Sequence, residues 1–307
     1  MLAGRIGIIG SGSIGLYYGG RLLQAGNDVH FLMRSGLEAA RTKGLRIYSG
    51  GGDFHAQNPQ VYVDTRTMGP CDLVVVALKA TSNPALESLI PPLLKDDTIL
   101  LTLQNGLGNE EFLAERWGED RVLGGLCFVC LTRRDPVSVD HVGQGVLSIG
   151  EYRRPASERL QRVVDGFQEA GIKTYAGENL AHERWRKLVW NIPFNGLSVA
   201  AGGLTVDQIL ADPELKQETI RLMNETRAIA EAEDHDIPAD FVDFQIKMTE
   251  PMGAYQPSTL VDWRAGRILE LQAIWEEPLR RAEALGVDTP SLRRLCEALR
   301  KASPKSA

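Results

Sequence analysis

Three polar side chains with helical spacing offer the clearest chemistry in the sequence. Lys187, Asn191 and Asn195 lie four residues apart in an otherwise apolar segment, so on a helix they share one face and drift by about 40° per step. A lysine ammonium can protonate or polarise a carbonyl oxygen, and two amides can orient a small polar substrate. Asparagine is unfavourable inside helices, so two in register need a reason. The alternative is a solvated helix face, and the spacing alone does not choose between them.

A second group of polar side chains surrounds a glycine. Ser258, Asp262 and Glu270 flank Gly266, which we predict ends one helix before another begins near Ile268. An unbroken helix would hold Ser258 and Glu270 about 18 Å apart, too far to share a small substrate, whereas a break could bring them together. The alternative is that Ser258 caps a helix and that Asp262 is a solvated acid.

The segment that starts at residue 10 predicts a nucleotide site. An apolar strand over residues 5–9 leads directly into Gly10-Ser11-Gly12-Ser13-Ile14-Gly15, a GxGxxG pattern followed by a helical stretch. In this motif the first glycine permits a tight turn, the second lets the backbone approach a pyrophosphate, and the third lets helix and strand pack closely. We interpret residues 10–15 as a dinucleotide-binding loop; the alternative is a glycine-rich turn in an unrelated α/β domain.

The end of the second predicted strand indicates which dinucleotide binds. An acidic residue about 20 positions after the motif would accept hydrogen bonds from an NAD ribose, but residues 29–35 contain no acid and include Arg34. A guanidinium suits a 2′-phosphate and gains little from a ribose diol. Arg34 therefore favours NADPH/NADP+ over NADH, the alternative being a solvated arginine in a turn.

Two further predicted strands end in polar residues. Lys79 follows the apolar run 73–78, and Asn105 follows the run 98–103. Ligands of open parallel sheets bind beyond the carboxyl ends of the strands, so both residues are placed to contact cofactor ribose, nicotinamide or substrate. Either could instead belong to a helix start or a turn.

The elements that must position these residues differ between the two halves of the chain. Before about residue 178, short apolar runs alternate with helical patterns, which is typical of βαβ units with a largely parallel sheet covered on both faces. The predicted strands are residues 5–9, 28–32, 72–78, 98–103, 122–131 and 146–149. Between residues 43 and 63 we expect only loops and edge strands.

From residue 178 onward the sequence contains almost no strand pattern. Segments 178–191, 212–233 and 268–285 carry apolar residues at spacings of three and four, as amphipathic helices do. We therefore predict an α/β Rossmann-type N-terminal domain over residues 1–177 and an all-α C-terminal domain over residues 178–307. Trp263 and Trp275 could belong to the core of this half or to a subunit interface.

Composition excludes several other classes of protein. The 307 residues are 43% hydrophobic and 24% charged, and 34 basic against 40 acidic residues leave a formal net charge of −6. That charge provides no global positive field for nucleic acid or an anionic membrane. No uncharged apolar stretch approaches the roughly 20 residues that span a bilayer, and no signal-peptide layout is present. We therefore expect a cytoplasmic protein that binds neither nucleic acid nor membrane.

Cys127 and Cys130 have the CxxC spacing that can indicate a metal or redox site. Their surroundings are typical of a strand, in which residues three apart point to opposite faces. No second CxxC and no histidine at ligand spacing accompany them, so we expect buried strand cysteines and no metal site.

Taken together, these motifs resemble the ketopantoate reductase (2-dehydropantoate 2-reductase) family over nearly the whole chain. The matching pieces, in order, are Gly10, Gly12 and Gly15, residues 78–80, 104–106 and 187–191 with Asn195, and residues 258–262 leading to 264–267 and Glu270. The resemblance implies a Rossmann domain, a helical domain and a site in the cleft between them. It also implies NADPH-dependent reduction of a 2-oxo acid to a 2-hydroxy acid, specifically 2-dehydropantoate to pantoate in pantothenate biosynthesis, and it leaves open a homodimer formed through the helical domain.

The resemblance also implies a role for each candidate residue. Lys187 corresponds to the family's proton donor, and Glu270 to the acid that contacts the nicotinamide ribose and helps position the lysine. Asn191, Asn195 and Ser258 correspond to substrate-binding positions, while Lys79 and Asn105 lie at the nicotinamide end, where Asn105 and Lys187 also face the substrate.

The departures from the family pattern lie near the expected substrate pocket. The family's usual Glu-Ile-Asp-x-x-Asn-Gly is replaced by Glu270-Leu-Gln-Ala-Ile-Trp275-Glu276, Thr205 stands where a further substrate asparagine is usual, and Pro193 should kink the lysine helix. Two alternatives therefore stay open: an NADPH-dependent reductase of another small 2-oxo acid, and a non-catalytic NADPH-binding regulator. The presence of both Lys187 and Glu270 argues against a regulator.

Overall fold

The computed structural model describes residues 2 and 4–304, and these fold into two compact units. The first unit contains the chain up to Gln104 together with Asn109–Leu180, and the second contains Asn105–Gly108 together with the chain from Ala181 onward. A short loop of the N-terminal half is therefore part of the C-terminal unit.

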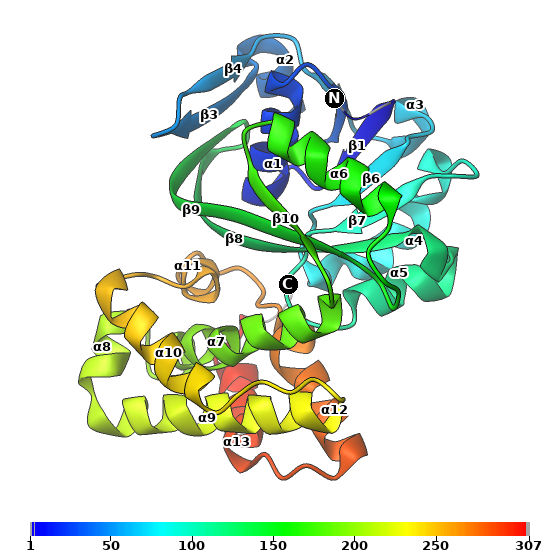
Figure 1. Ribbon diagram of the computed structural model, residues 1–307. Coiled ribbons are helices and arrows are strands. Elements are labelled where there is room, and N and C mark those ends of the chain that lie inside the picture. Colours follow the sequence, from blue (N-terminus) through cyan, green and yellow to red (C-terminus); the bar gives the residue numbers. More distant parts are fainter. Residues whose placement is uncertain (1, 3, 305–307) are drawn as a thin grey trace. The chain divides into compact units, whose positions relative to one another are not determined.

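The first unit is built on a mixed sheet, drawn from blue to green in Figure 1. The strands are β1 (Arg5–Ile9), β2 (Asp28–Leu32), β3 (Leu45–Ser49), β4 (Phe54–Ala56), β5 (Gln60–Tyr62), β6 (Leu73–Val76), β7 (Ile99–Thr102), β8 (Val122–Asp135), β9 (Ser138–Glu151) and β10 (Lys173–Gly177). Their order is β4-β3-β9-β8-β7-β6-β1-β2-β5, and β10 pairs with β9. The predicted Rossmann-type α/β class is confirmed.

Strands β5, β2, β1, β6, β7 and β8 run parallel, so their carboxyl ends meet at one edge. Strands β8 and β9 instead form a long antiparallel hairpin, which a tight turn can close. The predicted strands at 122–131 and 146–149 are parts of this hairpin, and β10 was not predicted. The outer part of the hairpin is only half-buried, and β8 has register shifts after Phe128 and Cys130, which weakens the alternation that marks a strand.

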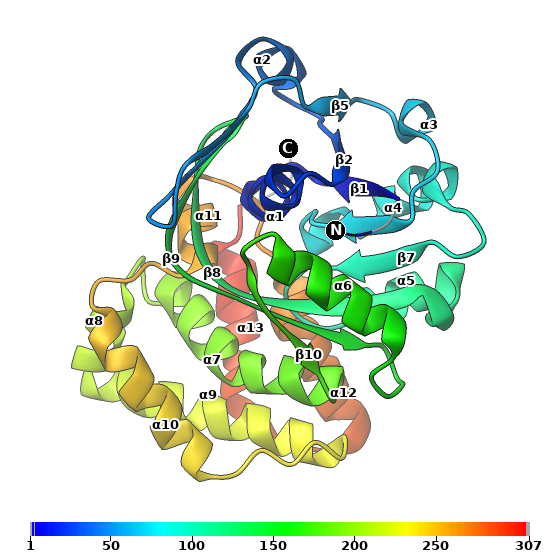
Figure 2. The same ribbon diagram turned by 45° about the horizontal axis from the view of Figure 1, so that its top comes forward.

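Helices cover both faces of this sheet. They are α1 (Ser13–Gln24), α2 (Leu37–Lys43), α3 (Thr65–Met68), α4 (Asn83–Leu89), α5 (Asn109–Trp117) and α6 (Glu158–Glu169). Side chains alternate along each strand: Ile6 and Ile8 pack with α1 and α6, whereas Ile9 packs with α4 and α5. Figure 2 shows the sheet curling round α1, which contacts β1 and β2 as well as β8 and β9.

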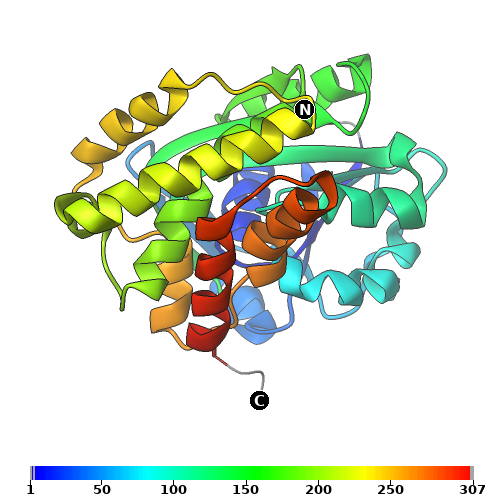
Figure 3. The same cartoon turned by 90° about the horizontal axis from the view of Figure 1, so that it is seen from below.

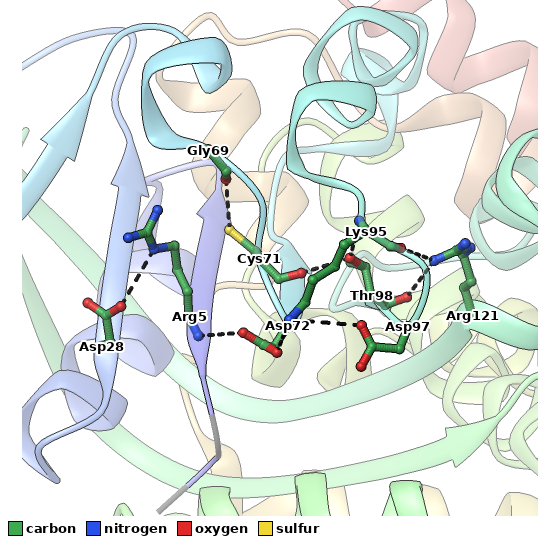
Figure 4. A network of polar contacts seen from close by, with 9 residues as sticks. All are labelled: Arg5, Asp28, Gly69, Cys71, Asp72, Lys95, Asp97, Thr98 and Arg121. Atoms are coloured by element: carbon green, nitrogen blue, oxygen red, sulfur yellow. Dashed lines mark hydrogen bonds and ion pairs between the residues drawn. The ribbon is translucent and has the colours of Figure 1, made fainter.

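A polar network joins the amino ends of the central strands (Figure 4). Arg5 donates its backbone N–H to Asp72 at 2.8 Å and lies 3.5 Å from Asp28, while Lys95 pairs with Asp72. Burial opposes the charge of Asp72, but hydrogen bonds from Lys95 and from the backbone of Arg5 outweigh it and lower the pKa of this carboxyl. Because these residues lie at the edge away from the glycine loop, we assign the network to the fold rather than to the site.

The second unit is helical in its described part. Its elements are α7 (Leu180–Ala200), α8 (Val206–Ala211), α9 (Pro213–Ala232), α10 (Asp240–Thr249), α11 (Ser258–Arg264), a π-helical turn (Gln272–Glu276), α12 (Glu277–Leu285) and α13 (Pro290–Ala302). The long helix α9, yellow in Figure 3, contacts α8, α10, α12 and α13. It begins where the sequence predicts, because Asp212 accepts hydrogen bonds from the N–H groups of Glu214 and Leu215. No helix in residues 2 and 4–304 is long and apolar enough to cross a membrane.

Helix α7 runs beyond the segment 178–191 and includes Asn195, as the spacing of Lys187, Asn191 and Asn195 predicts. It continues through Pro193 to Ala200, because Phe194, Leu197 and Val199 beyond the proline pack into the helical core. Trp275 also belongs to this core and is 0% exposed, while Trp263 is half-buried against it. Trp275 is therefore a core residue, whereas Trp263 packs against the core and keeps part of its side chain exposed.

Candidate active site

The glycine loop after β1 has two crowded positions and one open position. Gly10 has a φ of +106°, and a Cβ there would lie 2.6 Å from the backbone N of Leu78. A Cβ on Gly15 would lie 2.0 Å from the carbonyl oxygen of Gly10, whereas a Cβ on Gly12 would have no atom within 4 Å. Gly10 and Gly15 thus allow close packing, and Gly12 leaves open space over the loop.

The N-terminus of α1 lies beside this open space. Ser13 and Ile14 are in its first turn, and no side chain caps it. Ser11 is engaged in the fold, because its hydroxyl donates to the carbonyl oxygen of Leu32 at the end of β2 at 2.8 Å. The first N–H groups of a helix and its dipole favour an anion. The loop and helix therefore fit the pyrophosphate of a dinucleotide.

Arg34 lies two residues beyond β2, on the same side as the glycine loop. Its side chain is exposed and forms no hydrogen bond or ion pair with a residue in the described part of the chain. The acids nearest to it in the sequence have other partners: Glu38 pairs with Arg41 at 3.1 Å, and Asp28 at the start of β2 bonds His30 at 2.8 Å. The guanidinium is therefore available to an anionic ligand.

Lys79 lies beyond the carboxyl end of β6, as the sequence predicts. It is half-buried and extended, and it precedes a short 3-10 turn over Ala80–Ser82 that leads into α4. It therefore stands at the same edge of the sheet as the glycine loop.

The loop that carries Asn105 is embedded in the helical unit. A Cβ on Gly106 would lie 2.3 Å from the carbonyl oxygen of Ala273, and the N–H of Leu107 donates to that oxygen at 2.9 Å. Leu107 is buried in the helical core. Lys187 Nζ donates to Asn105 Oδ1 at 2.9 Å. The structure thus brings together two candidate residues that are 82 positions apart in the chain.

Both ends of this loop are held by amides that the sequence reasoning missed. Gln104 donates to Asn83 Oδ1 at 2.7 Å and accepts from the hydroxyl of Thr102 at 3.0 Å, while Asn83 donates to Asn109 Oδ1 at 3.0 Å. Thr102, Gln104 and Asn109 are buried. The signal that could have found them is a pair of amide residues that bracket a short glycine-rich loop.

In the polar stripe on α7, Asn191 and Asn195 are buried and Lys187 is half-buried, so the alternative of a solvated face does not hold. Asn191 is 8% exposed, and its side chain makes no hydrogen bond with any residue in 2 and 4–304. Asn195 is 3% exposed, and its Oδ1 accepts from the backbone N–H of Thr259 at 3.1 Å and from the hydroxyl of Ser258 at 3.4 Å. Asn195 therefore caps α11, whereas Asn191 offers an amide without a protein partner.

The chain breaks at Gly266, as the sequence predicts. Helix α11 ends at Arg264, and Gly266 has a φ of +66°. Asp262 lies 3.3 Å from Arg267 and so is not a simple solvated acid. Glu270 is half-buried, and its carbonyl oxygen accepts from the N–H of Ile274 in the π-helical turn at 3.2 Å. Glu270 thus directly precedes the turn on which the Asn105 loop rests.

Cys127 and Cys130 both lie in β8 and form no disulfide. Cys127 packs towards the core with Val129 and Leu131, and both cysteines are half-buried rather than buried. The expectation of strand cysteines is confirmed, but the expectation that they are buried is wrong, because this part of the hairpin lies at the margin of the core. The described residues contain no group of three histidine, cysteine or acidic side chains that could hold a metal.

Two family models match the chain. The model described as "Ketopantoate reductase PanE/ApbA" matches residues 6–154, and the model described as "Ketopantoate reductase PanE/ApbA C terminal" matches residues 179–303.

Relatives over the whole chain carry matching names. A protein of Nostoc sp. named 2-dehydropantoate 2-reductase is 40% identical over 290 residues, which cover 93% of this chain and 91% of that protein. The crystal structure of 2-dehydropantoate 2-reductase from Geobacter metallireducens has a TM-score of 0.95 at 40% identity and covers 97% of this chain and 100% of its own. The structure of the protein of that name from Methylococcus capsulatus has a TM-score of 0.90 at 32% identity and covers 98% of both chains.

Proposed function

The chain belongs to the ketopantoate reductase family, and on that premise we propose that it reduces 2-dehydropantoate (ketopantoate) to pantoate with NADPH. The observation that carries the proposal is the 2.9 Å hydrogen bond from Lys187 Nζ to Asn105 Oδ1. It holds an ammonium group against the loop Asn105–Gly108 of the same unit. In the sequence this loop directly follows β7, and ligands of parallel sheets bind beyond the carboxyl ends of the strands.

The two units contribute different parts of this reaction. In the first, Gly10, Gly12, Gly15 and the first turn of α1 hold the pyrophosphate, and Arg34 holds the 2′-phosphate. In the second, Asn191 offers its unpartnered amide to the substrate one helical turn beyond Lys187. We assign Lys79, Asn105 and Glu270 to contacts with the nicotinamide and its ribose. Asn195 and Ser258 are assigned to the substrate.

The proposed role of Lys187 is to supply the proton. When bound, NADPH would supply the hydride that adds to the carbonyl carbon of the 2-oxo acid and would thereby become NADP+. Lys187 gives a proton to the carbonyl oxygen as negative charge develops there, so that the product is the neutral hydroxyl. Asn105 Oδ1 can only accept, so it holds the ammonium without competing for its proton.

A direct assay tests this function and its two alternatives. Oxidation of NADPH is followed by absorbance with ketopantoate and with 2-oxoisovalerate, which lacks the hydroxymethyl group, and NADH serves as the cofactor control. We expect the highest kcat/KM with NADPH and ketopantoate. A higher value with the smaller acid would favour a reductase of another 2-oxo acid, and binding of NADPH without oxidation by any 2-oxo acid would favour a regulator.

Replacement of Arg34 tests the choice of cofactor. Because a charge-assisted hydrogen bond to phosphate contributes about 1.5–3 kcal/mol, Arg34→Ala should raise the KM for NADPH by roughly ten- to a hundredfold. The KM for NADH should stay near the wild-type value, since NADH has no 2′-phosphate. Arg41→Ala is the matched control, because Arg41 is an exposed arginine of the adjacent α2 that pairs with Glu38. Equal changes for both cofactors would contradict the assignment.

A further inference from the structure

Helix α7 contains a weak point within its polar stripe. Pro193 lies inside the helix, after Lys187 and Asn191 and before Asn195. A proline has no N–H for the carbonyl four residues back, here that of Val189, and its ring crowds that carbonyl. The helix is therefore weakened between Asn191 and Asn195. How Lys187 and Asn191 lie relative to Asn195 depends on the other residues that contact α7 near Pro193.

Trp275 contacts α7 at that point. Its indole Nε1 donates to the carbonyl oxygen of Ile192, the residue directly before the proline, at 3.0 Å. The side chain is 0% exposed and packs in the helical core. An indole N–H in such surroundings needs an acceptor, so the hydrogen bond also fixes how Trp275 lies.

The turn of α7 that follows Pro193 leaves space for the indole of Trp275, because it carries Gly196. A Cβ on Gly196 would lie 2.9 Å from Trp275 Nε1 and 2.7 Å from Leu295 Cδ2. A larger residue at 196 would push Trp275 away from the carbonyl oxygen of Ile192. The missing side chain of Gly196 thus leaves the space that the Trp275 indole needs to reach the carbonyl oxygen before Pro193.

The turn that carries Trp275 also supports the loop that holds the lysine. Trp275 belongs to the π-helical turn Gln272–Glu276, and π-helical turns are rare and concentrate at functional sites. In the same turn, the carbonyl oxygen of Ala273 accepts the N–H of Leu107, two residues after Asn105. One turn of chain thus contacts both α7 and the loop that binds Lys187.

We propose that Trp275 is a positioning residue, which holds α7 at its proline and so sets Lys187 and Asn191 relative to Asn105 and Asn195. The inference rests on the proposed function of these residues. It also accounts for one departure from the family pattern, since Trp275 stands where that pattern has asparagine and takes a core position here.

Trp275→Phe tests this role because it keeps an aromatic ring and removes the indole N–H. With NADPH, kcat for ketopantoate should fall roughly tenfold and the KM for ketopantoate should rise, because a small misplacement of reacting groups is costly. The KM for NADPH should stay near the wild-type value. The matched control is Trp263→Phe, which removes an indole hydrogen bond to the carbonyl oxygen of Ala302, also 3.0 Å long and in the same unit.

Hydrogen–deuterium exchange of the enzyme without ligands provides a second readout. Amides of α7 around Pro193 should exchange faster in Trp275→Phe than in the wild type or in Trp263→Phe. If the wild type does not reduce ketopantoate, the proposed function fails, and the exchange comparison still tests Trp275. Equal kinetic losses in the two variants, or unchanged exchange in α7, would overturn the inference.

Discussion

Lys187→Ala should lower kcat for ketopantoate by roughly a thousandfold or more, since a positioned general acid contributes about 10²–10⁴ and charge stabilisation adds to it. Lys187 is half-buried, and its Nζ is held 2.9 Å from Asn105 Oδ1. A water molecule in its place would not be held in the same position and would carry no positive charge. The dissociation constant of NADPH, measured by titration of the nicotinamide fluorescence, should stay near the wild-type value, because the glycine loop and Arg34 are unchanged.

Lys247→Ala is the matched control for this variant. Lys247 is an exposed lysine of α10 in the same unit, and it plays no part in the proposed site. Its loss should leave kcat, KM and the melting temperature close to those of the wild type. A Lys187→Ala variant that keeps its turnover would remove the lysine from the mechanism.

Two substitutions in the glycine loop should separate cofactor binding from folding. Gly12→Asp should weaken NADPH binding by roughly a hundredfold or more, because a carboxylate would occupy the helix N-terminus and repel the phosphates. Gly12 has a φ of −79°, which other residues adopt, and no atom lies within 4 Å of a Cβ there. Aspartate is also a favourable N-cap. The melting temperature of this variant should therefore be equal to that of the wild type or higher.

Gly15→Ala should instead destabilise the fold. Its Cβ would lie 2.0 Å from the carbonyl oxygen of Gly10, and backbone on both sides must move. We expect a loss of about 1–3 kcal/mol in the free energy of unfolding, measured by denaturant titration. If Gly12→Asp destabilised the protein while NADPH still bound normally, the assignment of Gly12 to the pyrophosphate would be wrong.

The sequence correctly predicted those helices, strands and breaks that are determined by residues adjacent to one another in the chain. Strands β1 and β2 have the predicted bounds, because each is a short apolar run that ends in a turn. Helix α9 begins at the predicted place because Asp212 and Pro213 are adjacent residues that start a helix on their own. The break at Gly266 was predictable for the same reason, since only its own backbone conformation is involved.

Elements that depend on distant partners were not predictable. Strand β10 was missed because its five residues are a strand only when paired with β9. The spacing of Lys187, Asn191 and Asn195 placed Asn195 on the lysine helix, but it did not give the end of α7 at Ala200, which depends on apolar side chains buried against other helices. Neither partner is adjacent in the chain.

The same division holds for the candidate site. By itself the sequence determined the residue types: a glycine loop with room for phosphates, an arginine where an acid would select NAD, and a lysine in a row with two asparagines. Only the tertiary structure decided that Asn105 belongs with Lys187, that Asn195 caps α11, and that Trp275 contacts α7 at its proline. Spacing along one helix or strand is set by local geometry, whereas contacts between residues 64 to 83 positions apart are set by how the core packs.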